Sequence, residues 1–196
     1  GWSLRERGAG PVQELAFSLW TALKNTRRNK SRKPCILLSS HNNFIEEIAK
    51  FRAARLLWSQ LAPGSLEIYA KTSRAAFTKQ KFWNNIVRTT LQALQAILGG
   101  VEYLEILPLS RSPAKCSPWA GQLAEDTHES LKNEIGLNSA DLLSGSFCVE
   151  AKTEELTQAA FDEIKKLQML APRETQRYIK RVLNKRRKSH ASKTSR

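Results

Sequence analysis

The feature that most constrains the fold is a repeated order of short apolar runs and longer helical segments. The apolar runs cover residues 34–39, 66–70 and 103–107. The first run shows no polar alternation, which is typical of a strand covered on both faces in a parallel sheet. Repetition of strand, polar loop and helix predicts an α/β fold with a parallel sheet and right-handed crossovers.

The helical segments are recognised by apolar residues that recur with a period of 3.6. They are predicted over residues 12–23, from Asn43 to 61, from Asn84 or Asn85 to 98, and over 119–133 and 153–170, with a loop over 110–118. Asn43 and Glu46 resemble a capping box at the start of the second helix. Asn84 or Asn85 is predicted to cap the third helix, and Gly99-Gly100 to end it.

The number of strands is too small for a closed barrel. Only about three strands can be counted in 196 residues, whereas an eight-stranded α/β barrel takes roughly 250 residues. Three parallel strands leave exposed edges, which proteins normally cover or pair. The chain begins at Gly1, and its only methionine is Met169. We therefore expect a part of a larger whole, with an incomplete barrel domain over residues 1–170 and a basic tail over 171–196.

The charge is unevenly distributed. The chain carries 32 Lys and Arg against 18 Asp and Glu, a formal net charge of +14, which taken alone favours a nucleic-acid or membrane-surface partner. Residues 24–33 hold six basic residues and no acid, and residues 173–196 hold ten basic residues and one acid. The remainder has a net charge of −1. The body is thus balanced, and no apolar run of about 18 residues predicts a membrane span.

The two basic stretches are predicted to have different structures. Residues 24–33 are predicted to be a loop that is either solvated or in contact with the phosphates of CoA or nucleic acid. In the tail, residues 173–188 are predicted to form a short helix with Tyr178, Ile179, Val182 and Leu183 on one side. The remaining tail residues have the composition of a disordered segment.

The five tryptophans are expected to pack in the core; they are Trp2, Trp20, Trp58, Trp83 and Trp119.

The cysteines argue against both a disulfide framework and a zinc site. Cys35, Cys116 and Cys148 are odd in number, widely spaced and without a Cys-x-x-Cys pair. The chain also lacks a cluster of His and Cys that could ligate a metal. A reducing intracellular compartment is therefore expected, either the cytoplasm or the mitochondrial matrix.

Four segments, in order, resemble the methylmalonyl-CoA mutase family of cobalamin-dependent acyl-CoA mutases. They are GAGPVQELAF (8–17), HNNFIEEIAKFRAARLLW (41–58), NNIVRTTLQALQAILGG (84–100) and SGSFCVEAKTEELTQAAFDEIKKL (144–167). The resemblance implies the second half of a (β/α)8 barrel that threads acyl-CoA along its axis, followed by the start of a linker. It also implies rearrangement between methylmalonyl-CoA and succinyl-CoA, driven by the adenosyl radical of adenosylcobalamin.

The resemblance also assigns roles to individual positions. Trp2 and Ser3 fall where catalytic members carry a Tyr and a His that face the substrate. A serine hydroxyl cannot replace an imidazole donor at the thioester carbonyl, because a donor loses its effect when misplaced. Lys33 falls on an Arg that contacts CoA, and Tyr69 and Lys71 fall on a His-x-Gln pair. We therefore expect no catalytic residue in this chain and treat Lys33, Tyr69 and Lys71 as candidate substrate-binding positions.

One further segment resembles the cobalamin-binding motif Asp-x-His-x-x-Gly of the family. Residues 126–131 begin with Asp126 and place His128 two residues later, but they end in Leu131 and lie in a predicted helix. His128 is therefore expected to be a surface or packing residue. His41 is expected to border the helix that follows it. Adenosylcobalamin is expected to bind a domain absent from this chain, and no cofactor is expected for this chain alone.

Three hypotheses follow from these observations. The leading one is a non-catalytic chain of a mutase-like isomerase, inactive alone, that packs against a catalytic chain in a heterodimer. The first alternative is a fragment of an active barrel that contributes acyl-CoA contacts near Lys33 and Tyr69. The second alternative is a basic nucleic-acid-binding protein anchored by residues 173–196. It is disfavoured because no base-reading motif is visible.

Overall fold

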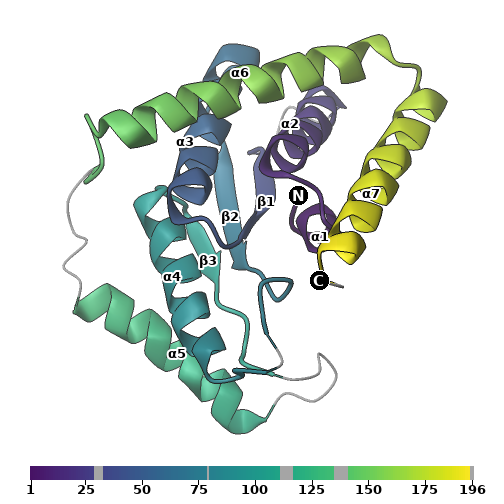
Figure 1. The fold of residues 1–196 in the computed structure, drawn as a ribbon. Helices are drawn as coiled ribbons and strands as arrows, with labels where there is room; N and C mark the ends of the chain where they lie inside the picture. The colour runs from purple at the N-terminus through teal and green to yellow at the C-terminus, as the bar shows by residue number, and fades with distance from the viewer. Residues whose placement is uncertain (29–32, 79, 111–116, 135–140, 195–196) are drawn as a thin grey trace.

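The computed structural model describes residues 1–28, 33–78, 80–110, 117–134 and 141–194 (Figure 1). These residues form seven helices and one three-stranded sheet, which confirms the α/β class. The elements in chain order are α1 (Trp2–Glu6), α2 (Pro11–Arg28), β1 (Cys35–Ser40), α3 (Phe44–Leu61), β2 (Glu67–Thr72), α4 (Asn84–Leu98), β3 (Tyr103–Glu105), α5 (Pro118–Asn133), α6 (Phe147–Met169) and α7 (Pro172–Thr194).

The sheet is parallel, with its strands in sequence order. Leu37 of β1 lies opposite Tyr69 of β2, which in turn lies opposite Tyr103 of β3. Alternate residues point to the helices and are buried, as Leu38 and Ile68 are, whereas Leu37 and Tyr103 on the other face are exposed. Helices thus cover one face of the sheet and leave the other open. This arrangement is consistent with a segment of an α/β barrel.

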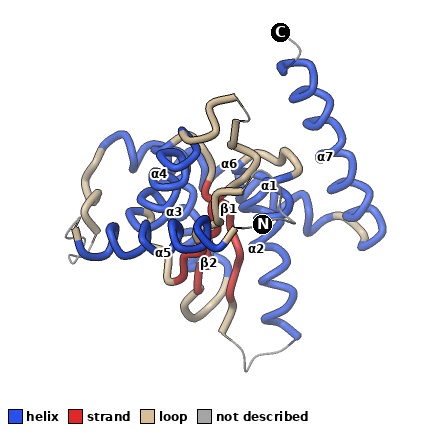
Figure 2. The backbone as a smooth tube through the Cα atoms, turned by 90° about the horizontal axis from the view of Figure 1, so that it is seen from below, coloured by secondary structure: helices blue, strands red, loops and turns tan. Residues whose placement is uncertain are grey.

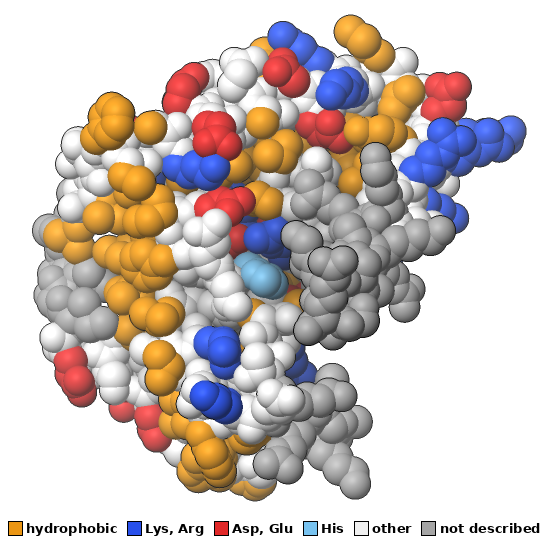
Figure 3. Space-filling model, in the orientation of Figure 1, with side chains coloured by type: hydrophobic (Ala, Val, Ile, Leu, Met, Phe, Trp, Pro, Cys, Tyr) orange, Lys and Arg blue, Asp and Glu red, His pale blue; other side chains and the backbone are white. Residues whose placement is uncertain are grey.

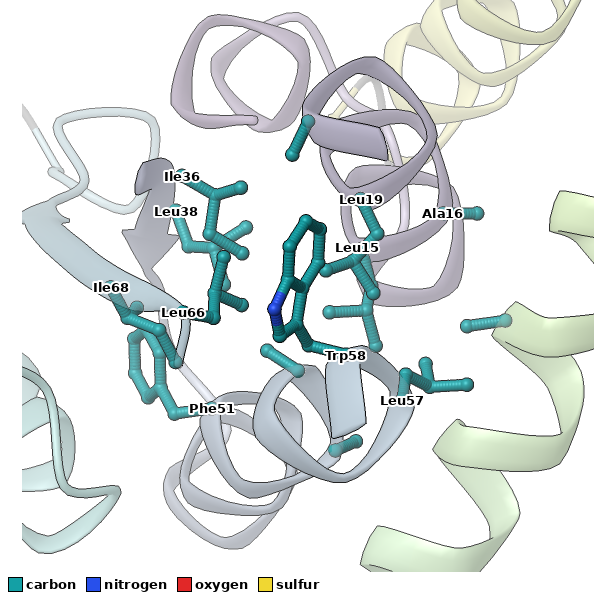
Figure 4. Close-up of a cluster of buried hydrophobic side chains, with 14 of the residues drawn as sticks. Leu15, Ala16, Leu19, Ile36, Leu38, Phe51, Leu57, Trp58, Leu66 and Ile68 are labelled. Carbon is teal, nitrogen blue, oxygen red and sulfur yellow. The ribbon is translucent and has the colours of Figure 1, made fainter. Parts of the chain in front are cut away.

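The hydrophobic core lies between β1, β2 and the helices α2, α3 and α6. Trp58 of α3 is 1% exposed, and its indole lies between Leu15 of α2 and Leu66 at the start of β2 (Figure 4). Helix α6 crosses α2 and α3 and closes this layer with four buried side chains, Leu156, Ala160, Ile164 and Leu167. Burial of these faces is what orders the helices, since isolated helices of this length are marginal in water.

The predicted helices and strands are confirmed as element types, but several ends differ. Of the predicted loop over 110–118, residues 111–116 lie outside the described residues. Helix α2 continues past Leu23 to Arg28, because Lys and Arg are good helix formers and their charges suit the carboxyl end of the helix dipole. Helix α6 begins at Phe147, ahead of the predicted residue 153. Strand β3 is shorter than predicted and ends at Glu105. The short helix α1 was not predicted, since five residues are too few to show a period.

Asn43 is the N-cap residue of α3, as predicted, but the predicted cap of α4 by Asn84 or Asn85 is wrong. Asn43 precedes α3 with φ 89° and makes no side-chain bond to the helix backbone; its amide contacts the Glu46 carboxylate instead. Helix α4 is preceded by Trp83, and Asn85 lies inside the helix. The Asn85 side chain instead donates to the Thr78 carbonyl and accepts from the Thr78 N–H, at 3.0 Å each. Asn85 therefore fixes the loop ahead of α4 rather than capping the helix.

Helix α7 extends past the predicted end at residue 188 to Thr194, because no Gly or Pro interrupts it. The Tyr178 ring meets Phe17 of α2 edge-on, with centroids 6.5 Å apart, and its hydroxyl donates to Glu163 of α6 at 2.7 Å. Ile179 and Val182 also pack against the main core, as predicted. The first half of α7 is therefore docked on the body, while its last turns project away from it (Figure 2).

The prediction that all five tryptophans pack in the core is confirmed for Trp20 and Trp58 but wrong for Trp83 and Trp119. Trp83 is 61% exposed and Trp119 is 51% exposed, and their rings meet edge-on at 5.7 Å. Val87 and Leu91 continue the exposed stripe along α4, and Figure 3 shows a band of hydrophobic side chains there. Within the described residues, no helix is long and apolar enough to cross a membrane.

Candidate functional site

An ionic cluster with three fully buried members lies at the carboxyl end of β1. The Lys50 ammonium of α3 donates to Glu14 of α2 at 2.8 Å, to Glu47 at 2.5 Å and to the Ser39 carbonyl at 2.5 Å. Arg5 lies in α1, and its guanidinium pairs with the other carboxylate oxygen of Glu47 at 2.9 Å. We call Arg5, Glu14, Glu47 and Lys50 the ionic cluster. It joins α1, α2, α3 and β1 at one point.

The charges of the ionic cluster balance, with two carboxylates and two cations. Burial alone would raise the pKa of Glu47, but Lys50 and Arg5 outweigh it and hold that pKa below its usual range. The second oxygen of Glu14 accepts from the Ser39 N–H at 2.6 Å, so the buried acid is fully engaged. Buried ion pairs of this kind fix a geometry more than they add stability. The signal in the sequence was a set of charged residues within otherwise apolar helix faces.

The open face of the sheet holds two of the predicted site residues, Tyr69 and Lys71. The Tyr69 ring stacks on Tyr103 of β3 with centroids 6.0 Å apart and an interplanar angle of 24°. One row further along the strands, Lys71 forms an ion pair with Glu105 at 2.7 Å. Tyr103 and Glu105 were missed, because finding them requires the register between β2 and β3.

Trp2 joins the same face from α1. Its indole N–H donates to the Thr72 carbonyl at 3.1 Å, and the Lys71 ammonium lies 4.8 Å from its ring centroid. Such cation–π contacts hold a ring and a cation together. We call Trp2, Tyr69, Lys71, Tyr103 and Glu105 the inner-face cluster. The structure thus brings together three of the five positions that the sequence singled out.

The other two predicted positions lie elsewhere. Ser3 is exposed on α1. Lys33 precedes β1 and reaches Glu67 at 3.8 Å, with 76% of its side chain exposed. Glu67 begins β2, so Lys33 lies at the amino ends of the strands, whereas ligands of α/β barrels bind at the carboxyl ends. The basic stretch is helical up to Arg28, with the Lys24 ammonium 3.8 Å from the Trp20 ring centroid, and residues 29–32 lie outside the described part.

A cleft of about 850 Å³ opens at the carboxyl ends of β1 and β2, between α1 and α7. His41, directly after β1, and Ala75, after β2, belong to its lining. Glu6 also lines it, and its carboxylate accepts from the Ser73 hydroxyl and from the Ala75 N–H. Burial raises the pKa of Glu6, and these hydrogen bonds only partly offset that effect.

The described residues include no group of side chains that fits a metal centre. His128 lies exposed on α5 with its Nε2 atom 3.1 Å from the Leu104 carbonyl oxygen, so its ring borders the sheet. Within the described residues, no three His, Cys, Asp or Glu side chains lie close enough to hold a metal ion. Cys35 and Cys148 are free thiols, and Cys116 lies outside the described residues.

Sequence comparison places the chain among known mutases. The family described as Methylmalonyl-CoA mutase matches residues 1–172. Methylmalonyl-CoA mutase of Cereibacter sphaeroides is 31% identical over 87% of this chain and 27% of its own length.

Two further relatives are similar. The large subunit of 2-hydroxyisobutanoyl-CoA mutase of Aquincola tertiaricarbonis is 30% identical over 86% of this chain and 34% of its own length. Mitochondrial methylmalonyl-CoA mutase of Bos taurus is 27% identical over 86% of the chain and 25% of its own length. This chain thus spans between a quarter and about a third of these relatives, and it belongs to the methylmalonyl-CoA mutase family.

Proposed function

We propose that this chain is a non-catalytic barrel segment of a mutase-like isomerase, one that interconverts methylmalonyl-CoA and succinyl-CoA or a close analogue. It acts by packing against a catalytic chain. The observation that carries the proposal is the inner-face cluster. Trp2 and Lys71 occupy positions that the family resemblance gives to substrate contacts, yet they bind Thr72, Glu105 and each other.

The chemistry of the inner-face cluster supports this reading. The indole N–H of Trp2 is used by a backbone carbonyl, and the Lys71 ammonium is neutralised by Glu105. Neither group is available to polarise a thioester without first breaking these contacts. Catalysis by oriented donors needs groups that are already aimed at the developing charge. Ser3, the remaining position, is exposed and carries only a short hydroxyl.

The exposed face and edges of the sheet support the proposal of a partner chain. On the open face, Leu37 is 38% exposed and Tyr103 is 49% exposed. Strands β1 and β3 are the terminal strands of the described sheet. Exposed strand edges and apolar faces are normally covered or paired in native proteins. A catalytic chain that covers this face would satisfy both needs.

The test is an assay of mutase activity with adenosylcobalamin, for this chain alone and after mixing with a methylmalonyl-CoA mutase catalytic chain. We expect no turnover by this chain alone, and co-elution with the catalytic chain in gel filtration. Turnover by the purified chain would overturn the non-catalytic role. Absence of co-elution at micromolar concentrations would overturn the packing role.

The alternative of an active barrel fragment is favoured by the length of the chain relative to its relatives, 27% of the Cereibacter sphaeroides enzyme. It makes a different prediction. A fragment that keeps acyl-CoA contacts should bind methylmalonyl-CoA by itself, and Tyr69→Ala or Lys33→Ala should weaken that binding. Calorimetric titration of the chain and these two variants distinguishes the two functions.

A further inference from the structure

The cleft between α1 and α7 is an unassigned site with a distinct charge pattern. One wall carries Arg5 and Arg7 at the end of α1, and the facing wall carries Lys180 of α7. His41 lies at the strand ends between them. The cleft is separate from the inner-face cluster, because none of that cluster's five side chains lines it.

Two of the cations in the cleft are not neutralised. Arg5 is paired with Glu47. Glu6, the one acid among the described lining residues, accepts hydrogen bonds from the neutral donors Ser73 and Ala75 and keeps its own charge, so Arg7 and Lys180 together exceed it by one positive charge. Arg7 and Lys180 form no ion pair with any described residue. Uncompensated charges on facing walls raise the positive potential of a cleft and attract anions.

The position of Lys180 is fixed by the helix that carries it. Two residues earlier, Tyr178 is held between Phe17 and Glu163. Ile179, directly before Lys180, packs against the core. The wall formed by α7 is therefore part of the folded body. It lies beyond residue 172, where the family match ends.

We propose that this cleft binds a small phosphate-bearing anion with more than one negative charge, held between Arg7 and Lys180. The volume of about 850 Å³ lies within the range of small-molecule sites. Two cations on facing walls suit a polyanion better than a monocarboxylate. The Arg7 guanidinium offers the forked donors that phosphate accepts, and Lys180 adds a point charge. This site does not depend on the proposed role in a mutase assembly.

The test is calorimetric titration of the full chain with inorganic pyrophosphate and with ADP at low salt. Arg7→Glu and Lys180→Glu should each weaken binding by about tenfold or more, since a charge-assisted hydrogen bond contributes about 1.5–3 kcal/mol. Arg177→Glu is the matched control, because Arg177 is exposed on the same helix and does not line the cleft. It should change affinity by less than about twofold, since exposed charges contribute little. Far-UV circular dichroism checks that each variant is folded.

Each outcome has a defined meaning. Tighter binding of ADP than of pyrophosphate assigns an organic phosphate ester to the cleft, and equal binding assigns the phosphate groups alone; both support the site. Equal weakening in Arg177→Glu shows a general attraction of polyanions to the basic helix and overturns it. Unchanged affinity in Arg7→Glu and Lys180→Glu, or no binding of either probe, also overturns it.

Discussion

Lys50 is the residue whose removal should cost most, because it is buried between two carboxylates. Lys50→Met keeps much of the volume but leaves Glu14 without a cation and Glu47 with Arg5 alone. Breaking a buried pair by removing one partner costs about 3–5 kcal/mol. The midpoint of urea unfolding should therefore fall sharply. Lys152→Met, which breaks the surface pair with Glu155, should change stability by less than about 1 kcal/mol. Equal effects of the two variants would contradict the role of the ionic cluster.

Glu47 should make the protein sensitive to acid. Its pKa in the folded state is held below the unfolded value of 4.5, so its ionised form stabilises the fold. That contribution is present above pH 4.5 and is lost as the pH falls toward the lowered pKa. Urea unfolding between pH 7 and pH 3 should show it, and Glu47→Gln should flatten the acid limb. Glu155→Gln, on the surface of α6, should leave the pH profile unchanged.

Tyr178 provides a test of how the element α7 is docked. Burial and the bond to Glu163 raise its pKa to about 12 from 10.0. The folded pKa is the higher one, so the stabilisation is complete below pH 10 and is lost as the pH rises toward 12. Absorbance titration of tyrosinate should show one group with a midpoint near pH 12, absent in Tyr178→Phe. Protease cleavage within α7 should become faster over the same pH range, and an unchanged rate would contradict the docking.

Helix α4 provides a second test at the level of a single helix, because one of its sides is exposed and the other is buried. Val87 and Leu91 are exposed, whereas Ala96 is fully buried. Leu91→Lys should change the free energy of unfolding by less than about 0.5 kcal/mol. Ala96→Lys should destabilise the fold by several kcal/mol, because it buries an unpaired charge. Thermal unfolding of both variants measures the difference, and a destabilised Leu91→Lys would show that this side of α4 is not exposed.

The sequence predicted element types well and contacts between elements less well. The periodic spacing of apolar residues and the polar segments between them reflect local structure. The helices and strands of the body were therefore predicted in the right order. Trp83 and Trp119 were wrongly predicted to be buried, because the sequence alone does not distinguish a tryptophan in the core from one in an exposed aromatic pair. Lys71 was singled out from resemblance, but its partner Glu105 follows only from the strand register. The ionic cluster likewise needs four elements to be brought together before its pairing is visible.

At the scale of the whole molecule, the open face of the sheet should make this chain more stable in the proposed assembly than alone. A partner that binds only the folded state stabilises it by mass action, by about 2.7 kcal/mol at a hundredfold excess over the dissociation constant. Addition of a methylmalonyl-CoA mutase catalytic chain should therefore raise the Tm of this chain. Hydrogen exchange should slow at Tyr103 and Leu104, in the terminal strand of the described sheet.

Substitutions on the open face of the sheet should show whether the partner raises the Tm by packing on that face. Tyr103→Lys places a charge on the side where the partner is proposed to pack, next to Tyr69. It should abolish the rise in Tm, while the Tm of the chain alone falls only slightly, because Tyr103 is half exposed and loses only its stacking on Tyr69. Val87→Lys, on the outer side of α4, should leave the rise intact. If Val87→Lys abolishes the rise and Tyr103→Lys does not, the partner packs on the outer surface of α4 and the sheet remains open in the assembly.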